Sequence, residues 1–519
     1  MSGPGGNGNG GMWAEGGAQV PGEGLRTTAA RGVLWTGGGQ VLRQLVQVVT
    51  SVLLARLLMP ADFGLLGMAL VFYGLVQLFS DFGLGAAIIQ VRGLTGLALS
   101  SSFWLNVLVA IVLALALSSA APWIAAFYGD PRLAPIVAVL SIGLIFGGFV
   151  VVPRAVLYKE LRFAEIAKAQ AVGSIVGAVC ALTLAWLGFG VWSLVVQPLL
   201  GSATTMVLTI FYARWFPAVR FHWGSIRKMT GFSAAVLGAD VVNYAHREGD
   251  NLLVGKFLGS GPLGYYSLAY QLMLYPMNQV SQVIVRILFP VLSTLQDQLT
   301  RYREVYLKAV AAIAFVTFPM MVGLFAVARD LVTVVFGAKW LPMLPVLQIL
   351  CWVGMLQSVA TTAGLIYLST GHARTRLVFS LFATPVFLAF VILGLPWGVV
   401  GVAGGYAVAA FLVAYANYRV AFRLIGLSLR QFHAALGRPV AASALMFAVV
   451  KVAEWRLVGY VRWPADGRLA FLVALGVVAY VVISALINRG QFAEIKFLFM
   501  SARGSGGAAP GAQAPGGGA

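Results

Sequence analysis

The feature that most constrains the fold is a series of apolar runs, most of them about 20 residues or longer, between Gly32 and Asn488. A helix of that length crosses the hydrocarbon core of a bilayer, which is about 30 Å thick. The runs are continuous and lack the period-2 alternation that a membrane strand shows. The chain is 60% hydrophobic, whereas soluble domains are about 45–50% apolar. We therefore expect an all-α polytopic membrane protein.

The apolar runs divide into about 14 expected spanning segments joined by short loops, which leave no room for a separate soluble domain. These segments are 33–57, 63–89, 99–121, 133–153, 164–187, 190–213, 231–255, 263–288, 306–328, 341–367, 376–395, 398–422, 438–456 and 468–488. The Gly-rich ends cannot bury a core and are expected to be disordered. The expected division is a tail at 1–25, an N-terminal lobe of helices 1–6 at 26–215, a C-terminal lobe of helices 7–12 at 216–428, helices 13–14 at 429–490, and a tail at 491–519.

The formal net charge of +19 does not indicate nucleic-acid binding, because the Lys and Arg residues lie in short loops between apolar segments. Loops rich in Lys and Arg stay on the cytoplasmic side of a membrane. Counting them predicts that both termini are cytoplasmic. The two cysteines and four histidines are scattered without ligand spacing, so we expect no metal site and no cofactor.

An internal repeat organises the chain. The segment Ala55–Gly64 matches Gly255–Gly264 at an offset of 200 residues, with Arg56 opposite Lys256 and Gly64 opposite Gly264. Six expected spans separate the copies. An even number gives both halves the same orientation about an axis along the membrane normal. We therefore expect two pseudo-symmetric six-helix lobes, followed by two helices without a counterpart.

Two expected helices at equivalent repeat positions carry matched polar stripes. Residues at steps of three or four share one face of a helix. Charged side chains in the middle of a membrane usually face a cavity or a partner. The alternative is internal pairing: Arg43 with a carbonyl or an amide, and Arg247 with Asp240 or Asp250. The candidate binding residues of these stripes are Gln40, Arg43, Gln44 and Gln47 in the first segment, and Asn243 and Arg247 in the seventh.

The eighth segment is polar where its repeat equivalent, the second segment, is apolar. Amides and tyrosine hydroxyls offer hydrogen bonds to a polar ligand, which makes the C-terminal lobe the more polar wall of the expected cavity. Hydrogen bonding between helices is the alternative. The candidate residues here are Gln271, Tyr275, Asn278, Gln282 and Arg286.

Acidic residues are rare in the expected spans. Asp240 and Asp250 lie in the seventh segment. A carboxylate at that depth can take up a proton or a cation. We expect these two residues to couple transport to an ion gradient.

Six segments of the chain carry recognisable motifs, namely 55–65, 79–90, 152–163, 250–259, 263–269 and 335–340. They resemble the polysaccharide transporter family, which includes the Wzx-type oligosaccharide flippases of the multidrug/oligosaccharidyl-lipid/polysaccharide exporter superfamily. The resemblance covers nearly the whole stretch from Arg31 to about Asn488.

The resemblance implies a two-lobed bundle around a central cavity. It also implies movement of undecaprenyl-diphosphate-linked oligosaccharide repeat units across the bacterial inner membrane by alternating access, without covalent chemistry. Arg43 and Arg247 would then meet the diphosphate. The implied partners are the lipid-linked oligosaccharide, membrane lipids, and polysaccharide polymerase and export proteins.

Three alternatives stay open from the residues alone. Two belong to the same superfamily, a drug/cation antiporter and a lipid II flippase. The third is a membrane glycosyltransferase or polymerase, which would need a long external loop with catalytic residues. The expected external loops have only about 5 to 15 residues.

Overall fold

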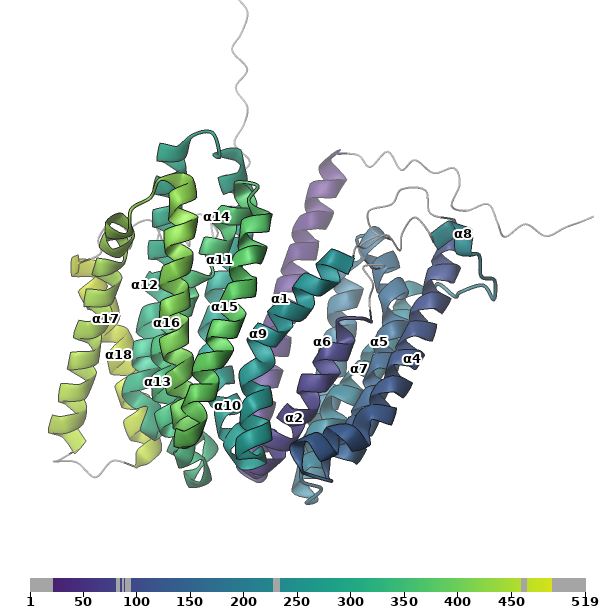
Figure 1. The fold of residues 1–519 in the computed structure, drawn as a ribbon, viewed down its shortest axis with the longest axis horizontal. Coiled ribbons are helices and arrows are strands. Elements are labelled where there is room, and N and C mark those ends of the chain that lie inside the picture. The colour runs from purple at the N-terminus through teal and green to yellow at the C-terminus, as the bar shows by residue number, and fades with distance from the viewer. Residues whose placement is uncertain are drawn as a thin grey trace, which may run out of the picture. The chain divides into compact units, whose positions relative to one another are not determined.

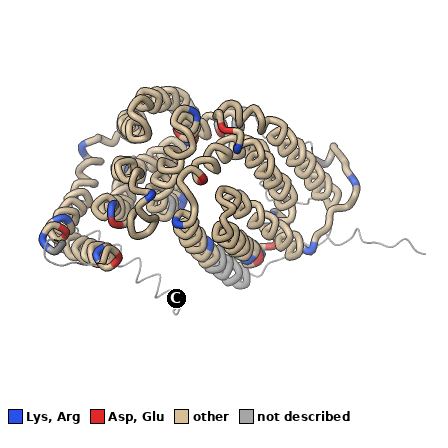
Figure 2. Tube along the Cα trace, turned by 90° about the horizontal axis from the view of Figure 1, so that it is seen from below, with Lys and Arg blue, Asp and Glu red and all other residues tan. Residues whose placement is uncertain are grey.

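The computed structural model of the chain describes residues 22–80, 85, 88, 95–226, 234–458 and 464–487. Every regular element in these ranges is a helix, and no strand occurs among them (Figure 1). This confirms the expected all-α class. Long helices satisfy their own backbone hydrogen bonds, as a chain in hydrocarbon requires. Charged residues are sparse along the helices (Figure 2).

The first part of the chain forms α1 (Gly22–Leu57), α2 (Pro60–Gln77), α4 (Gly96–Tyr128), α5 (Leu133–Lys159), α6 (Phe163–Trp186), α7 (Val191–Ala213) and the single turn α8 (Trp223–Ile226). The middle part forms α9 (Ala234–Leu258), α10 (Ser260–Pro276), the π-helix η1 (Met277–Ser281), α11 (Gln282–Thr294), α12 (Leu299–Leu331) and the π-turn η2 (Val332–Phe336). The last part forms η3 (Ala338–Met343), α13 (Leu344–Ala360), α14 (Ala363–Ser369), α15 (Ala373–Gly394), η4 (Leu395–Trp397), α16 (Gly398–Ile425), α17 (Leu429–Val458) and α18 (Ala465–Ile487).

Each expected spanning segment is helical over most of its described length. Within the described residues, ten helical stretches are long and apolar enough to cross a membrane, and one of them, Ala373–Ile425, contains both α15 and α16. The polar helices α1 and α9 are not among these stretches. The chain is therefore a multi-pass membrane protein, and the number 14 stays a prediction.

The expected tails lie mostly outside the described residues, which begin at Gly22 and end at Ile487. One difference occurs at the N-terminal end. Helix α1 begins at Gly22, before both the expected end of the tail and the expected start of the first span. Residues 25–31 contain Leu, Arg and Ala, which are good helix formers, so the helix extends beyond its apolar part.

The chain divides into two compact units. The first comprises residues 1–269, 335–346 and 380–406. Within it α4 packs on α5, α6 on α7, and α1 on α6 (Figure 1). Glycines allow the close approach of α6 and α7, because a Cβ at Gly177 would meet the carbonyl oxygen of Gln197. Small residues serve helix packing in membranes in this way.

The second unit comprises residues 270–334, 347–379 and 407–519. Here α12, α17 and α18 pack together (Figure 1). The carboxylate of Asp330, which is 5% exposed, forms an ion pair with Arg468 and so ties α18 to α12. Buried hydroxyls also join elements of this unit: Tyr302 bonds to Ser369 over 2.6 Å, and Tyr306 bonds to Thr362 over 2.8 Å.

The eighth expected span is interrupted at a proline. Helix α10 ends at Pro276, the π-helix η1 follows at once, and α11 then continues from Gln282. Proline cannot donate the backbone hydrogen bond of its position and clashes with the preceding turn. The extra residue of a π-turn accommodates that defect.

The two copies of the repeat meet where α2 and α10 begin. A Cβ at Gly64 would overlap the backbone carbonyl of Ser260, and a Cβ at Gly264 would overlap that of Pro60. Pro60 and Ser260 are themselves 200 residues apart, so the two contacts are reciprocal. One turn further on, a Cβ at Gly67 would lie 3.4 Å from Cδ2 of Leu263. Both crossing positions therefore require glycine for steric reasons.

This crossing predicts that Gly64→Ala destabilises the folded protein. The added methyl group would displace backbone, and overpacking of this kind costs about 1–3 kcal/mol. Gly261→Ala is the matched control. Gly261 lies near the start of α10, as Gly264 does, and no atom approaches its Cβ position within 4 Å. Thermal unfolding of the purified protein in detergent should show a lower transition temperature for Gly64→Ala alone. Equal transition temperatures would contradict the proposed close contact.

Candidate substrate and ion sites

The polar stripe of α1 contacts α6 through Arg43. The guanidinium donates a 3.1 Å hydrogen bond to Oε1 of Gln170 and a second bond to Oε1 of Gln40. A guanidinium carries five N–H donors, so the two amides orient it without using all of them. Arg43 and Gln44 are half-buried, while Gln40 and Gln47 are exposed. The amide pairing considered for Arg43 is thus present, and it leaves donors for a ligand.

The stripe of α9 contains a short ionic network. Arg247 forms an ion pair with Glu248 over 3.2 Å and lies over the ring of Tyr244 at 5.4 Å. Its pairing with Asp240 or Asp250, considered above, is replaced by this contact with its sequence neighbour. The other oxygen of Glu248 accepts a 2.9 Å bond from Nδ2 of Asn251. The Arg247 side chain is 60% exposed, and Asp240 and Asn243 are exposed as well.

Asp250 is the buried acid of this network. It is 1% exposed and accepts a 2.7 Å hydrogen bond from the hydroxyl of Tyr266 on α10. The backbone N–H of Asn251 donates to its other oxygen over 2.8 Å. Among the described residues no Lys or Arg forms an ion pair with it. A buried carboxylate without a counter-charge is costly, so uptake of a proton or a cation would stabilise this site.

The candidate residues of the eighth expected span belong to the second unit from Gln271 onward. Gln271, Tyr275 and Gln282 are half-buried, and Arg286 is exposed. The hydroxyl of Tyr275 is shielded and has no hydrogen-bond partner among the described residues. The side chain of Asn278 lies outside the described part of the structure.

The end of α1 is closed by residues from a distant segment. The indole of Trp340 is fully buried and donates to the carbonyl of Ala55 over 2.8 Å. The ammonium of Lys339 donates to the carbonyls of Arg56 and Leu58 over 2.7 and 2.6 Å. The last carbonyls of a helix lack intrahelical partners and attract cations. These three bonds therefore hold η3 against the end of α1.

A second pair of contacts joins the repeat copies at this same end. Arg56 donates from Nε to the carbonyl of Val335 over 2.8 Å, and its repeat partner Lys256 donates to the carbonyl of Phe127. Both acceptors lie two residues before a glycine with positive φ, which is 75° at Gly129 and 98° at Gly337. Each cation thus binds the equivalent helix end in the other copy. We call these two bonds, with the Gly64 and Gly264 contacts, the reciprocal clasp.

The loop after Phe127 is fixed by a local ion pair. Arg132 and Asp130 lie 2.7 Å apart, and the hydrogen bond from Arg132 lowers the pKa of the Asp130 carboxyl. The pair is exposed on the Arg132 side and adds little stability at such a site. Its effect is to shape the turn.

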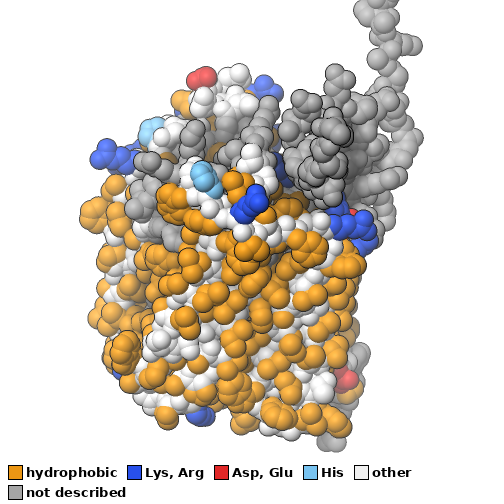
Figure 3. Space-filling view, turned by 90° about the vertical axis from the view of Figure 1, so that its right-hand side faces the viewer, with side chains coloured by type: hydrophobic (Ala, Val, Ile, Leu, Met, Phe, Trp, Pro, Cys, Tyr) orange, Lys and Arg blue, Asp and Glu red, His pale blue; other side chains and the backbone are white. Residues whose placement is uncertain are grey.

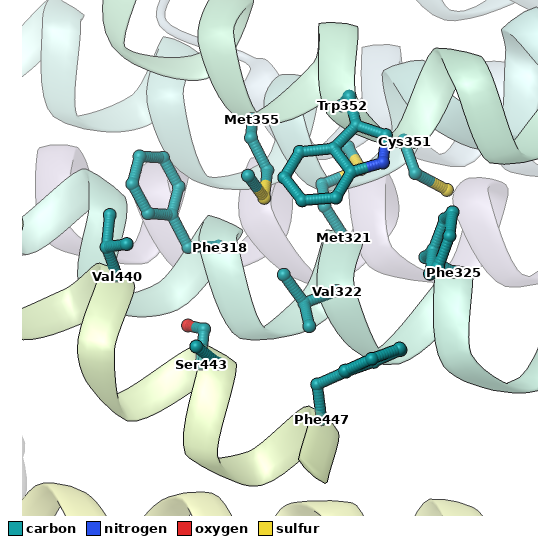
Figure 4. Close-up of a pocket in the computed structure, with 11 residues that line it drawn as sticks. Phe318, Met321, Val322, Phe325, Cys351, Trp352, Met355, Val440, Ser443 and Phe447 are labelled. Carbon is teal, nitrogen blue, oxygen red and sulfur yellow. The ribbon is translucent and has the colours of Figure 1, made fainter. Parts of the chain in front are cut away.

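An apolar pocket lies in the second unit between α12, α13 and α17 (Figure 4). Its lining includes Phe318, Phe325, Trp352 and Phe447. The hydroxyl of Ser443, which also lines it, donates a hydrogen bond to the carbonyl of Pro439. Its volume is about 620 Å³ with its open mouth included. None of the candidate polar residues contributes to the lining. The pocket suits hydrocarbon and offers little to a sugar or a phosphate.

Sequence reasoning missed the residues that complete these sites. Gln170 and Tyr266 come from neighbouring helices, and periodicity within one helix carries no signal for such partners. Lys339 and Trp340 lie in the motif segment 335–340, and the motif itself does not indicate their contacts. Among the described residues no three His, Cys, Asp or Glu side chains gather as metal ligands would.

The chain is similar to proteins of polysaccharide biosynthesis. A family model described as "Polysaccharide biosynthesis protein" matches residues 53–345. The chain is 30% identical to the lipopolysaccharide biosynthesis protein WzxC of Escherichia coli K12, over 80% of this chain and 85% of that protein. It is 26% identical to the teichuronic acid biosynthesis protein TuaB of Bacillus subtilis 168, over 86% of this chain and 93% of that protein.

The fold is similar to a solved structure, the inward closed conformation of the lipid II flippase MurJ. The TM-score is 0.70 at 14% identity, covering 88% of this chain and 99% of that one. At this level of identity the likeness concerns the fold alone. The family match and the identity to WzxC carry the assignment: the chain belongs to the polysaccharide biosynthesis protein family, as one of its Wzx-type transporters.

Proposed function

We propose that this protein moves undecaprenyl-diphosphate-linked oligosaccharide repeat units of an O-antigen, exopolysaccharide or capsule across the bacterial inner membrane by alternating access. Both termini would face the cytoplasm, and the end of α1 with its clasp would face outward. The relatives named for polysaccharide biosynthesis support this cargo over a drug or a cation. Polymerase and export proteins would receive the translocated unit.

The observation that carries the proposal is the exposure of cationic and amide groups on the polar helices α1 and α9, in a chain whose long apolar helices suit a bilayer. Arg247 is largely exposed and Arg43 keeps free donors after its bonds to Gln40 and Gln170. An arginine facing hydrocarbon is disfavoured by about 2.5–3.5 kcal/mol on insertion scales. We infer that these stripes line a cavity and that Arg43 and Arg247 bind the diphosphate, since guanidinium groups bind phosphate in a bidentate manner.

In this proposal the sugar would bind to polar residues of the N-terminal lobe, 26–215, and of the C-terminal lobe, 216–428. Gln40, Gln44, Gln47 and Asn243 would bind its hydroxyls from one side. The residues of the more polar wall would be Gln271, Tyr275, Asn278, Gln282 and Arg286. The unpartnered hydroxyl of Tyr275 supports this assignment, because a shielded polar group without a partner is costly unless a ligand or water completes it.

The reciprocal clasp supports the alternating-access step. In the clasp, cationic side chains of one repeat copy donate to backbone carbonyls at helix ends of the other copy. Water could solvate these carbonyls equally well once this end of the protein opens. Such bonds close one end of a cavity at little net cost. The two lobes would separate here to release the sugar outward.

The proposed diphosphate site predicts that Arg43→Ala lowers transport about 10–100-fold, because a charged hydrogen bond contributes about 1.5–3 kcal/mol. Gln170→Ala should lower transport less, since it removes only the support of the guanidinium. Arg430→Ala, at an exposed arginine of α17 outside both stripes, is the control. Flipping of an undecaprenyl-diphosphate-linked oligosaccharide in liposomes would measure this. A normal rate for Arg43→Ala would remove Arg43 from the site.

We further propose that Asp250, and with it Asp240, couples transport to a proton or sodium gradient. Asp250 is buried with a single tyrosine and a backbone N–H as donors, so its charge must be compensated in part of the cycle. Asp250→Asn should make flipping independent of the imposed gradient while the protein stays folded. Asp240→Asn tests whether the exposed acid contributes. Full gradient dependence in Asp250→Asn would refute the role of Asp250.

A further inference from the structure

The segment from the end of α7 to the start of α8 holds an exposed row of apolar residues, most of them aromatic. Phe216 is 77% exposed, Val219 91% and Trp223 54%, and Phe221 is also exposed. Large apolar side chains are rarely this exposed together on a surface that contacts only water. The row therefore needs a partner.

The loop is held in place by hydrogen bonds to α4. The backbone N–H groups of Ala218 and His222 donate to the hydroxyls of Ser100 and Ser101 over 3.0 and 2.9 Å. The indole of Trp104 donates to the carbonyl of Ala218 over 3.0 Å. Both serines are buried. The exposed side chains are thus presented from a fixed backbone.

The inner side of the loop is packed by one aromatic residue. The ring of Trp215 lies 5.9 Å from that of Phe103 on α4, in an edge-to-face arrangement. Trp215 is half-buried, whereas its neighbour Phe216 points outward. One side of the segment therefore anchors it to the helix bundle, and the other side presents the apolar row.

The charge of this region is positive without any acidic residue. Arg214 and Arg220 belong to the loop, Arg227 and Lys228 follow in the sequence, and no Asp or Glu occurs between Glu165 and Asp240. On the face shown in Figure 3, most visible Lys, Arg and His side chains gather at the upper rim, above a broad hydrophobic band. Helix α8 lies at this upper end (Figure 1).

Aromatic residues combined with arginines at the edge of a hydrophobic band suit the headgroup region of a bilayer. Each Arg near an anionic leaflet contributes about 1 kcal/mol of attraction. A water-filled substrate path would not favour Phe216 and Val219. A protein partner would have to cover a surface directly beside the bilayer.

We propose that residues 214–223 form an interfacial segment that binds the anionic lipid surface of the leaflet where α7 ends. Phe216, Val219, Phe221 and Trp223 insert between headgroups, and Arg214 and Arg220 bind lipid phosphates. The hydrogen bonds to Ser100, Ser101 and Trp104 transmit this attachment to α4. Only the name of the leaflet, cytoplasmic, rests on the proposed function.

The test places a fluorophore at Val219→Cys in a Cys180→Ser/Cys351→Ser background, with the full chain in nanodiscs of phosphatidylcholine and phosphatidylglycerol. We expect strong quenching by lipids with a shallow nitroxide, and iodide quenching several-fold weaker than for a label at Arg132→Cys. Strong iodide quenching without lipid quenching would overturn the proposal, and would favour an aqueous loop or a protein partner. Transport is not the readout, so failure here leaves the proposed function untouched.

The charge component is tested separately through lipid-dependent stability. Phosphatidylglycerol should raise the unfolding temperature of the wild-type protein relative to pure phosphatidylcholine, and Arg220→Gln should reduce this increase. Arg132→Gln should leave the increase unchanged. The loss of one arginine corresponds to about a fivefold weaker interaction with the anionic surface. An equal increase in Arg220→Gln and the wild type would contradict the assigned role of Arg220.

Discussion

Close backbone contact between the starts of α2 and α10 is the constraint on which the arrangement of the first unit depends. Gly64 and Gly264 allow each helix to touch the backbone of the other, and no side chain fits at either position. This contact brings Arg56 and Lys256 to helix ends in the opposite repeat copy, and it places η3 over the end of α1. A repeat in the sequence thus becomes a symmetric set of interactions at one end of the helices.

The role of each polar residue follows from whether the structure pairs it, exposes it or buries it. Groups that the structure pairs completely, such as Asp330 with Arg468, hold helices together. Groups that keep exposed donors, such as Arg43 and Arg247, are available to a ligand. Asp250 differs from both, because it is buried, hydrogen-bonded and without a described counter-charge. That combination fits a site whose charge changes during a cycle.

The positions of the helices followed from the sequence because the thickness of a bilayer fixes the length of an apolar run. The family also followed from local motifs, and the identity to WzxC confirms it. The hydrogen-bond and ion-pair partners of the polar residues could not be predicted from the sequence. Gln170 lies 127 positions from Arg43, and a stripe on one helix says nothing about its neighbour. The pairing of Arg247 with Glu248 likewise depends on rotamers rather than spacing. The start of α1 at Gly22 was missed because polar helix formers extend a helix without adding hydrophobicity.

The most direct test of the account is a reversible cross-link across the reciprocal clasp. Gly67→Cys and Leu263→Cys, in a Cys180→Ser/Cys351→Ser background, bring the sulfur of residue 263 to the place of the Leu263 Cγ, which lies 3.6 Å from a Cβ at residue 67, and the yield of the disulfide on oxidation is measured first. If the two repeat copies must separate at this end, oxidation will stop the flipping of a lipid-linked oligosaccharide in liposomes, and reduction will restore it. Unchanged transport by the quantitatively cross-linked protein would contradict the account.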